Sequence, residues 1–208
     1  SHYSTSLYIT YYLVRVFPYS SMRVELQGKN FDDPNRLFNS MKDSFECALT
    51  QKADLRELIP ELFCLPEMFY NLNDLNLGEL RNLEKKTSTP VHDIIMPNWS
   101  NNNGYNFIYY HRKSLESPEI SEKINEWINI IFGSKQKGSN AKKIGNLFCK
   151  QTYEDYDDVY NKSKIDDKIY LCRMVEFGLT PHQIFKKDAY KRQNLFEIKK
   201  KILMESFP

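Results

Sequence analysis

Gly133 and Gly138 have the spacing of the two glycines in a phosphate-binding loop. A P-loop needs Lys and then Ser or Thr directly after its second glycine, so that these side chains reach the phosphates and Mg²⁺. Ser139 and Asn140 stand there instead, and the residues before Gly133 follow a helical pattern where a P-loop needs a strand. The sequence therefore favours a turn between two helices over a nucleotide site.

The other residues that could bind metal or catalyse a reaction are scattered. The histidines show no metal-ligand spacing with one another or with the cysteines, and no serine lies in a G-x-S-x-G turn. The acidic cluster at 154–158 lacks the glycine of an EF-hand loop, which favours a solvated loop. We expect no enzyme activity, no metal and no cofactor. An unrecognised hydrolase stays an alternative, and it would require a pocket with a perturbed carboxylate or histidine. The histidines are His2, His92, His111 and His182, and the cysteines are Cys47, Cys64, Cys149 and Cys172.

The bulk properties are those of one globular domain of 208 residues. No apolar run approaches the roughly 20 residues that span a bilayer, and no signal peptide is recognisable at the N-terminus. The separated cysteines favour reduced thiols and a cytoplasmic location. Residues 186–208 hold seven basic and three acidic side chains, a local charge of +4 in a chain of total charge +2. A near-neutral body with a basic tail does not suggest a nucleic-acid binder.

The element that must organise this chain is the apolar segment 54–71, which contains two prolines and three glutamates. Neither a long helix nor a central strand passes undisturbed through Pro60 and Pro66. A segment so apolar must still be buried, and its backbone groups then need partners. The sequence predicts an irregular backbone that runs through a core.

Elsewhere the periodicity is mainly helical. We expect one helix to begin at Asp33-Pro34 and carry an apolar face through Leu49, and another to run from Ser117 along a stripe that includes Trp127, as a core residue, to a cap at Gly133. Further helices are expected at 139–148 and 166–177, and Thr180 to Gln183 has the form of a capping box. Residues 8–14 have strand propensity, and residues 83–99 resist assignment.

Blocks of sequence in a fixed order resemble the BEACH domain family. The blocks are His2-Tyr3-Ser4, Leu26 to Phe38 (LQGKNFDDPNRLF), Glu57 to Phe63 (ELIPELF), Leu65 to Phe69 (LPEMF), His111 to Ser117 (HRKSLES), Trp127 to Gly138 (WINIIFGSKQKG), Asn146-Leu147-Phe148, Thr152-Tyr153-Glu154 and Phe177 to Phe185 (FGLTPHQIF). They assign residues 1–185 to a BEACH-like domain that lacks the family's N-terminal part, followed by a basic tail at 186–208. Asp155 departs from the family's pattern, which usually has glycine there.

The resemblance implies a mainly α fold, with helices around extended segments that lack regular secondary structure. It favours a helix over a strand at residues 8–14. It implies a non-catalytic scaffold of a large cytoplasmic protein in vesicle trafficking, lysosomal and autophagic membrane dynamics. A PH-like domain would lie beside it, with a WD-repeat propeller after it. Peripheral membrane association is expected, and nucleic-acid partners are not.

Three groups of residues are candidates for contacts: the glutamates of the apolar segment with possible arginine partners, residues 135–137, and the lysines of the tail. The glutamates Glu57, Glu61 and Glu67 require partners where they are buried, and Arg36, Arg56 and Arg112 are suited to bidentate pairing with them. These pairs either tie the backbone together or line a groove for a partner. Lys135, Gln136 and Lys137 follow the Trp127 helix, where they either cap it or contact a partner or lipid headgroup.

The tail predicts a basic amphipathic helix with an apolar face from Leu195 to Leu203. The apolar face most simply packs on the protein itself. The alternative is that the helix binds an anionic membrane through Lys199, Lys200 and Lys201. Direct membrane binding through this tail is therefore the second functional hypothesis, beside the protein scaffold.

Overall fold

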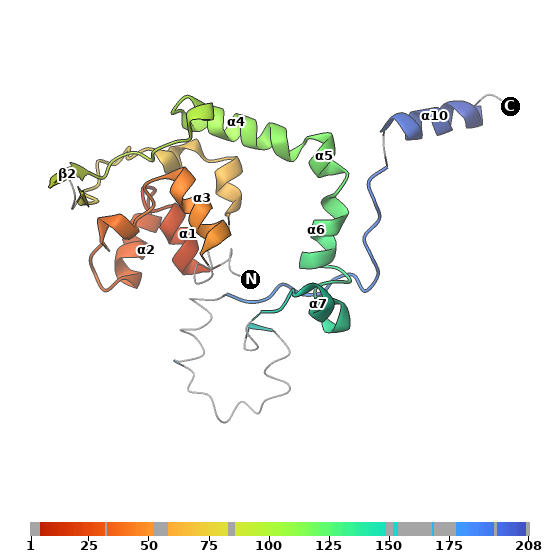
Figure 1. Ribbon diagram of the computed structural model, residues 1–208, viewed down its shortest axis with the longest axis horizontal. Coiled ribbons are helices and arrows are strands. Elements are labelled where there is room, and N and C mark those ends of the chain that lie inside the picture. The colour runs from red at the N-terminus through yellow and green to blue at the C-terminus, as the bar shows by residue number, and fades with distance from the viewer. Residues whose placement is uncertain are drawn as a thin grey trace. The chain divides into compact units, whose positions relative to one another are not determined.

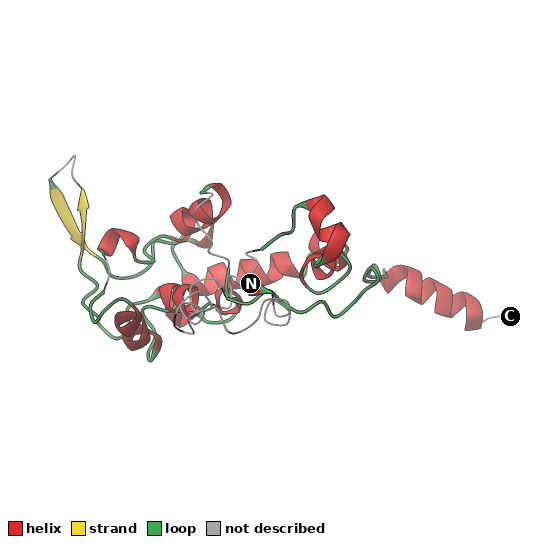
Figure 2. Ribbon diagram, turned by 90° about the horizontal axis from the view of Figure 1, so that it is seen from below, coloured by secondary structure: helices red, strands yellow, loops and turns green. Residues whose placement is uncertain are grey.

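The computed structural model describes residues 5–31, 33–51, 58–82, 86–148, 152–153, 168, 178–193 and 195–206. Helices predominate among them, with one antiparallel hairpin (Figure 2), which confirms the predicted mainly α fold. Within these ranges no helix has the length and apolar character needed to cross a membrane. The chain forms two compact units, Ser1–Arg112 with Lys150–Thr180 and Lys113–Cys149 with Pro181–Pro208.

The first unit begins with the helices α1 (Ser6–Tyr12) and α2 (Tyr19–Leu26), and α3 (Met41–Thr50) follows (Figure 1). The Thr5 hydroxyl caps α1 by accepting the Tyr8 amide at 3.2 Å, and the Ser40 hydroxyl caps α3 in the same way. The helix expected near residues 8–14 is confirmed. Its strand propensity gives way because a capped helix buries Tyr11 and Tyr12 in the core.

The single helix predicted from Asp33 to Leu49 is wrong. Asp33 does cap a turn, but this is the short 3₁₀ helix η2 (Pro34–Arg36), and the chain is extended again at Leu37. The carbonyl of Phe38 accepts a hydrogen bond from Arg15, and the carbonyl of Asn39 accepts one from the Ile95 amide. Hydrogen bonds from Arg15 and Ile95 therefore take the place of helical hydrogen bonds at Phe38 and Asn39. Because the helix is interrupted at these residues, α3 begins as a new helix with its own N-terminal cap.

The proline-containing segment is irregular and buried, as predicted, in its described part from 58 to 71. It forms two 3₁₀ turns, η3 (Pro60–Phe63) and η4 (Pro66–Phe69), and each begins with its proline, whose missing N–H costs nothing there. Leu62, Met68 and Phe69 are fully buried. Residues 54–57 lie outside the described residues.

The hairpin and α4 complete the first unit. Strands β1 (Glu79–Asn82) and β2 (Thr87–Pro90) pair with Leu80 opposite Thr89. Strand β2 lies in residues 83–99, which the sequence left unassigned. The 3₁₀ turn η5 (Asn98–Ser100) leads to α4 (Gly104–Leu115), from which the Phe107 ring packs edge-on against Phe69. The buried core of this unit includes Tyr12, Leu13, Val14, Leu37, Phe38, Ile59, Leu77, Ile94 and Met96.

In the second unit, the helix predicted from Ser117 to Gly133 is divided in two. Ser117 caps α5 (Pro118–Ser121), and α6 (Ile124–Ile131) begins after a turn. Trp127, predicted as a core residue, is 50% exposed, whereas Asn129 of α6 is buried. The Asn129 side chain accepts the Ala189 amide at 2.7 Å, so this helix turns a polar residue inward. Gly133 follows the cap residue Phe132 and does not itself cap α6.

The last helices are α7 (Gly138–Ile144), shorter than the predicted 139–148 because Gly145 ends it at a φ of 73°, and α10 (Leu195–Ser206). The capping box at Thr180 is wrong, since residues 178–193 form no helix. Gln183 instead donates to the carbonyl of Gly133 at 3.0 Å, and Thr180 bonds Thr152. The helix predicted at 166–177 lies outside the described residues, apart from the single position Lys168.

Candidate protein-interaction site

Glu61 and Glu67, the two described glutamates of the apolar segment, do not form the predicted pairs with arginine. Glu61 is half-buried, while Glu67 and Arg112 are exposed. No salt bridge joins these three residues to one another within the described part of the chain. Glu57 and Arg56 lie outside that part. The Glu61 and Glu67 carbonyls instead close the 3₁₀ turns by accepting the amides of Cys64 and Tyr70.

Arg15 ties irregular backbone together instead, and the sequence analysis did not single it out. Its side chain is 1% exposed, and its guanidinium donates to the carbonyls of His92 at 2.7 Å and Phe38 at 2.6 Å. Burial lowers the pKa of Arg15 to about 10, while the charge of Asp93 acts in the opposite direction. An arginine inside the apolar run Leu7 to Phe17 was the available signal, because a buried cation requires acceptors.

The three residues Lys135, Gln136 and Lys137 do not form one surface patch. Gln136 is buried and its side-chain amide donates to the Pro181 carbonyl. Lys135 is half-buried, and its carbonyl accepts the Asn146 side-chain amide at 3.0 Å. Lys137 is exposed at the start of α7. Gln136 therefore has a structural role, because its side chain holds the segment that follows Thr180.

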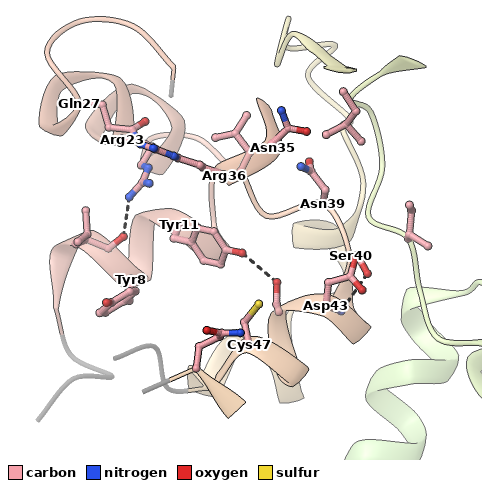
Figure 3. A pocket seen from close by; sticks show the side chains of 16 residues that line it. Tyr8, Tyr11, Arg23, Gln27, Asn35, Arg36, Asn39, Ser40, Asp43 and Cys47 are labelled. Atoms are coloured by element: carbon pink, nitrogen blue, oxygen red, sulfur yellow. Dashed lines mark hydrogen bonds between the residues drawn. The ribbon is translucent and has the colours of Figure 1, made fainter. Parts of the chain in front are cut away.

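The first unit has a cavity of about 1070 Å³ bounded by α1, α2, α3 and η2 (Figure 3). Among the described residues of its lining, Arg23 and Arg36 are basic and Asp43 is acidic. Tyr8, Leu80 and Ile95 contribute ring and aliphatic surface. Among the predicted site residues that the structure describes, Arg36 alone lines this cavity. Arg23 was missed because its α2 position is unremarkable in sequence.

His111 was the other candidate for chemistry, and it lies in an aromatic cluster. Its ring centroid lies 4.1 Å from that of Phe107 and 5.1 Å from that of Phe63, and Trp99 stacks at 6.1 Å. Burial lowers the pKa of His111, and its buried Nδ1 has no hydrogen-bond partner among the described residues. It does not line the cavity. Within the described residues, no three metal-ligating side chains gather.

The tail helix α10 exposes most of its described side chains, although Ile198 is half-buried. Phe196, Leu203 and Met204 expose most of their surface, with Met204 at 70%, and Lys199, Lys200 and Lys201 are exposed on the same helix. One ion pair, Lys201 with Glu205 at 4.0 Å, joins successive turns. The predicted helix is therefore present. The prediction that its apolar face packs on the protein is wrong for Phe196, Ile202 and Leu203, which are exposed.

Comparison with known proteins agrees with the order of the motifs. The family model described as "Beige/BEACH domain" matches residues 1–192. Over 93% of this chain, "Protein SPIRRIG" of Arabidopsis thaliana is 40% identical. "Beige protein homolog 1" of Schizosaccharomyces pombe is 37% identical over 92%, and a "Putative neurobeachin homolog" of Caenorhabditis elegans is 42% identical over 74%.

The chain spans only 5–7% of the length of these relatives. The similarity therefore covers nearly all of this chain and one small part of each relative. The family match, the identities and the irregular proline-containing core agree with one another: this chain belongs to the Beige/BEACH domain family.

Proposed function

We propose that this chain is a non-catalytic scaffold module that acts in vesicle trafficking and membrane dynamics through contacts with other proteins. The family match over residues 1–192 carries the proposal, since the family resemblance implies this role. The relatives are much longer than the domain they share with this chain, which suits one binding module among several. The proposed location is cytoplasmic, with peripheral association with endolysosomal or autophagic membranes.

The first partner to test is a PH-like domain, which the resemblance implies beside a BEACH domain. A PH-like domain from a BEACH family protein would be immobilised, and equilibrium binding of the full chain would be measured by surface plasmon resonance. We expect saturable binding that an unrelated PH domain does not show. Absence of binding by a chain that unfolds cooperatively, and is therefore folded, would contradict the proposal.

Membrane binding through α10 is the second candidate, and the exposed apolar and basic side chains of this helix favour it. An amphipathic helix binds anionic bilayers by burying apolar residues while its lysines approach the lipid phosphates. Phe196, Leu203 and Met204 would supply the apolar contact, and Lys199 to Lys201 the charge.

Liposome sedimentation separates this candidate from the first. We expect more binding to vesicles containing phosphatidylserine than to pure phosphatidylcholine vesicles, and loss of this excess when Lys199, Lys200 and Lys201 are all changed to Glu. The matched control changes the exposed Lys113, Lys142 and Lys143 to Glu. Equal binding to both vesicles, or equal loss in both variants, would exclude the helix as the membrane contact.

A further inference from the structure

The helix α6 exposes apolar side chains to solvent and turns a polar one inward. Ile124 and Trp127 are 36% and 50% exposed, and Ile120 of the preceding α5 is 41% exposed. An amphipathic helix of a folded domain usually buries its apolar side instead. We propose that Ile120, Ile124 and Trp127 form a self-association surface, the α6 ridge, on which a second copy of this chain docks its own ridge in antiparallel orientation. The inference goes beyond the proposed function and does not depend on it.

The rotation of α6 is fixed from within the second unit. Residues three and four positions apart lie on one face of a helix, so Ile124, Trp127 and Ile131 form one line along α6. Asn129 stands two positions after Trp127, which is about 200° further round the helix. Its side-chain oxygen accepts the Ala189 amide at 2.7 Å, and the residue is buried. The apolar line therefore turns inward only if this bond breaks.

Trp127 is suited to anchor such an interface. Its ring packs edge-on against Phe132, with the ring centroids 6.0 Å apart, so its position is fixed although half of its surface is exposed. Tryptophan carries a large apolar surface and is enriched among the residues that dominate binding energies at interfaces. A ring that is already held loses little conformational entropy when a partner covers it.

The charges beside the ridge are complementary to those of a second copy. Lys123 lies at the start of α6 and Glu126 follows within its first turn. Both are exposed, and neither forms an ion pair within the described part of the chain. By helical spacing they lie on the same flank of the ridge. Two antiparallel helices related by a two-fold axis bring the same flanks together, so Lys123 of each copy can face Glu126 of the other.

The same charges favour a second copy over a bilayer. The helix and the turn before it contain three glutamates and one lysine, namely Glu119, Glu122, Glu126 and Lys123. An anionic membrane would repel this excess of carboxylates, whereas a second copy supplies an opposite charge for both Lys123 and Glu126. The ridge of two short helices is smaller than the roughly 1,200–2,000 Å² interface of a stable complex. We therefore expect a weak dimer, with a Kd of roughly 10–100 μM.

Sedimentation velocity of the full chain, loaded from about 1 μM to about 300 μM, tests the proposal. We expect a reversible shift from monomer to dimer over this range. Lys123→Glu and Glu126→Lys should each weaken association by about tenfold. The loss should be larger for Lys123→Glu, because Glu119 and Glu122 already make this end of the ridge acidic. The matched control Lys142→Glu changes an exposed lysine on α7 of the same unit and should leave association unchanged.

An equimolar mixture of the two charge-reversed variants gives the sharpest result. In a mixed dimer, each glutamate at position 123 or 126 of one chain meets a lysine of the other. The mixture should therefore associate more tightly than either variant alone. Trp127→Ala should weaken association by about tenfold or more. Urea unfolding of every variant checks that the loss does not come from unfolding.

Self-association through the ridge is overturned if the parent chain stays monomeric, if the mixture associates no better than its components, or if Trp127→Ala associates like the parent. A monomeric chain whose binding to the PH-like domain is lost in Trp127→Ala would assign the ridge to that partner instead. A monomeric chain whose binding to phosphatidylcholine vesicles is lost in that variant would assign the ridge to a bilayer. Because the PH-like domain is measured separately, failure of the dimer and failure of the scaffold function are distinguishable.

Discussion

Among the described side chains with a shifted pKa, Arg15 and His111 are the two removed from solvent, and both serve the packing of the first unit. Arg15 is buried among backbone carbonyls, and His111 among aromatic rings. Neither lines the cavity, where Arg23 and Arg36 lie. A buried ionisable group is therefore evidence of internal support here.

Removal of the Arg15 guanidinium should strongly destabilise the protein. Arg15→Met keeps the aliphatic stem but leaves the carbonyls of His92 and Phe38 buried without their donor, so we expect a loss of about 3–5 kcal/mol in the free energy of unfolding. Urea denaturation measures it. The exposed Arg81→Met should change stability by less than about 0.5 kcal/mol. If Arg15→Met destabilised the protein no more than Arg81→Met does, the hydrogen bonds of Arg15 to His92 and Phe38 would contribute nothing to stability.

Stability should fall on acidification because of His111. Burial lowers its folded pKa below the ordinary 6.5, so the unfolded chain binds a proton more readily in the interval between the two values. The resulting loss of folding free energy is absent above pH 6.5. It grows as the pH falls from 6.5 to the folded pKa of His111, and it is complete below that pKa. Urea unfolding of His111→Gln from pH 8 to pH 5 should show a shallower decrease than the parent chain. An identical slope would contradict the expectation.

At the scale of elements, short turns and side-chain bonds position the chain as much as long helices do. The turns η3 and η4 bury Leu62 and Met68 although each is a single short 3₁₀ turn. The segment after Thr180 is held by Gln136, Gln183 and Asn129, whose amides bond backbone groups. A change at these points should loosen a whole segment.

A substitution at Gly133 tests whether the Asn129 side chain holds the segment after Thr180. A Cβ at Gly133 would lie 2.7 Å from the Asn129 Cα and 2.9 Å from its Oδ1. Gly133→Ala should therefore displace Asn129 and break its bond to Ala189, at a cost of about 1–3 kcal/mol. Hydrogen exchange at the Ala189 amide reports the broken bond. The exposed Ser139→Ala is the control. Unchanged protection of Ala189 in the Gly133 variant would show that the helix accommodates the methyl group.

The sequence predicts those elements well whose causes are local. Pro60 and Pro66 exclude long helix and central strand wherever they stand, so the irregular segment followed from their positions alone. The helix breaks at Leu37 and before Ile124 were missed. At Leu37 the cause is distant in sequence, because Arg15 and Ile95 supply the bonds. Trp127 was misassigned because periodicity locates a stripe but does not say which face the fold buries.

The candidate site was predicted less well than the fold. Of its two arginines, Arg36 came from the family-like motif, whereas Arg23 has no motif around it. Five separate stretches of the chain, at residues 7–11, 23–27, 35–51, 80 and 95, form the described lining, so no spacing in the sequence predicts it. The predicted glutamate pairs failed in the described part because Glu67 is exposed and needs no partner.

At the scale of the whole molecule, the two units differ in what holds them together. The first has a continuous core of aromatic and aliphatic side chains. In the second, the buried residues of the described part include Asn129, Ser134 and Gln136, with Ala141 as the buried apolar residue. Apolar burial is the larger source of stability, since a single hydrogen bond contributes only about 1 kcal/mol net.

The second unit should therefore open more easily than the first. Native-state hydrogen exchange should show greater protection at the amides of Leu13 and Ile94, which bond Ile9 and Phe69, than at those of Ile184 and Ala189. Mass spectrometry with fragmentation resolves these positions. Equal protection throughout would mean that the chain unfolds as one cooperative body.

The prolines of η3 and η4 have a consequence for the chain before it folds. An apolar stretch of roughly six or seven residues without proline can pair with its copies in other molecules and begin a fibrous aggregate. Pro60 and Pro66 leave five residues between them, and one of these is Glu61. The positions that start the buried turns thus also interrupt intermolecular strand pairing, so this apolar segment is protected from aggregation during synthesis.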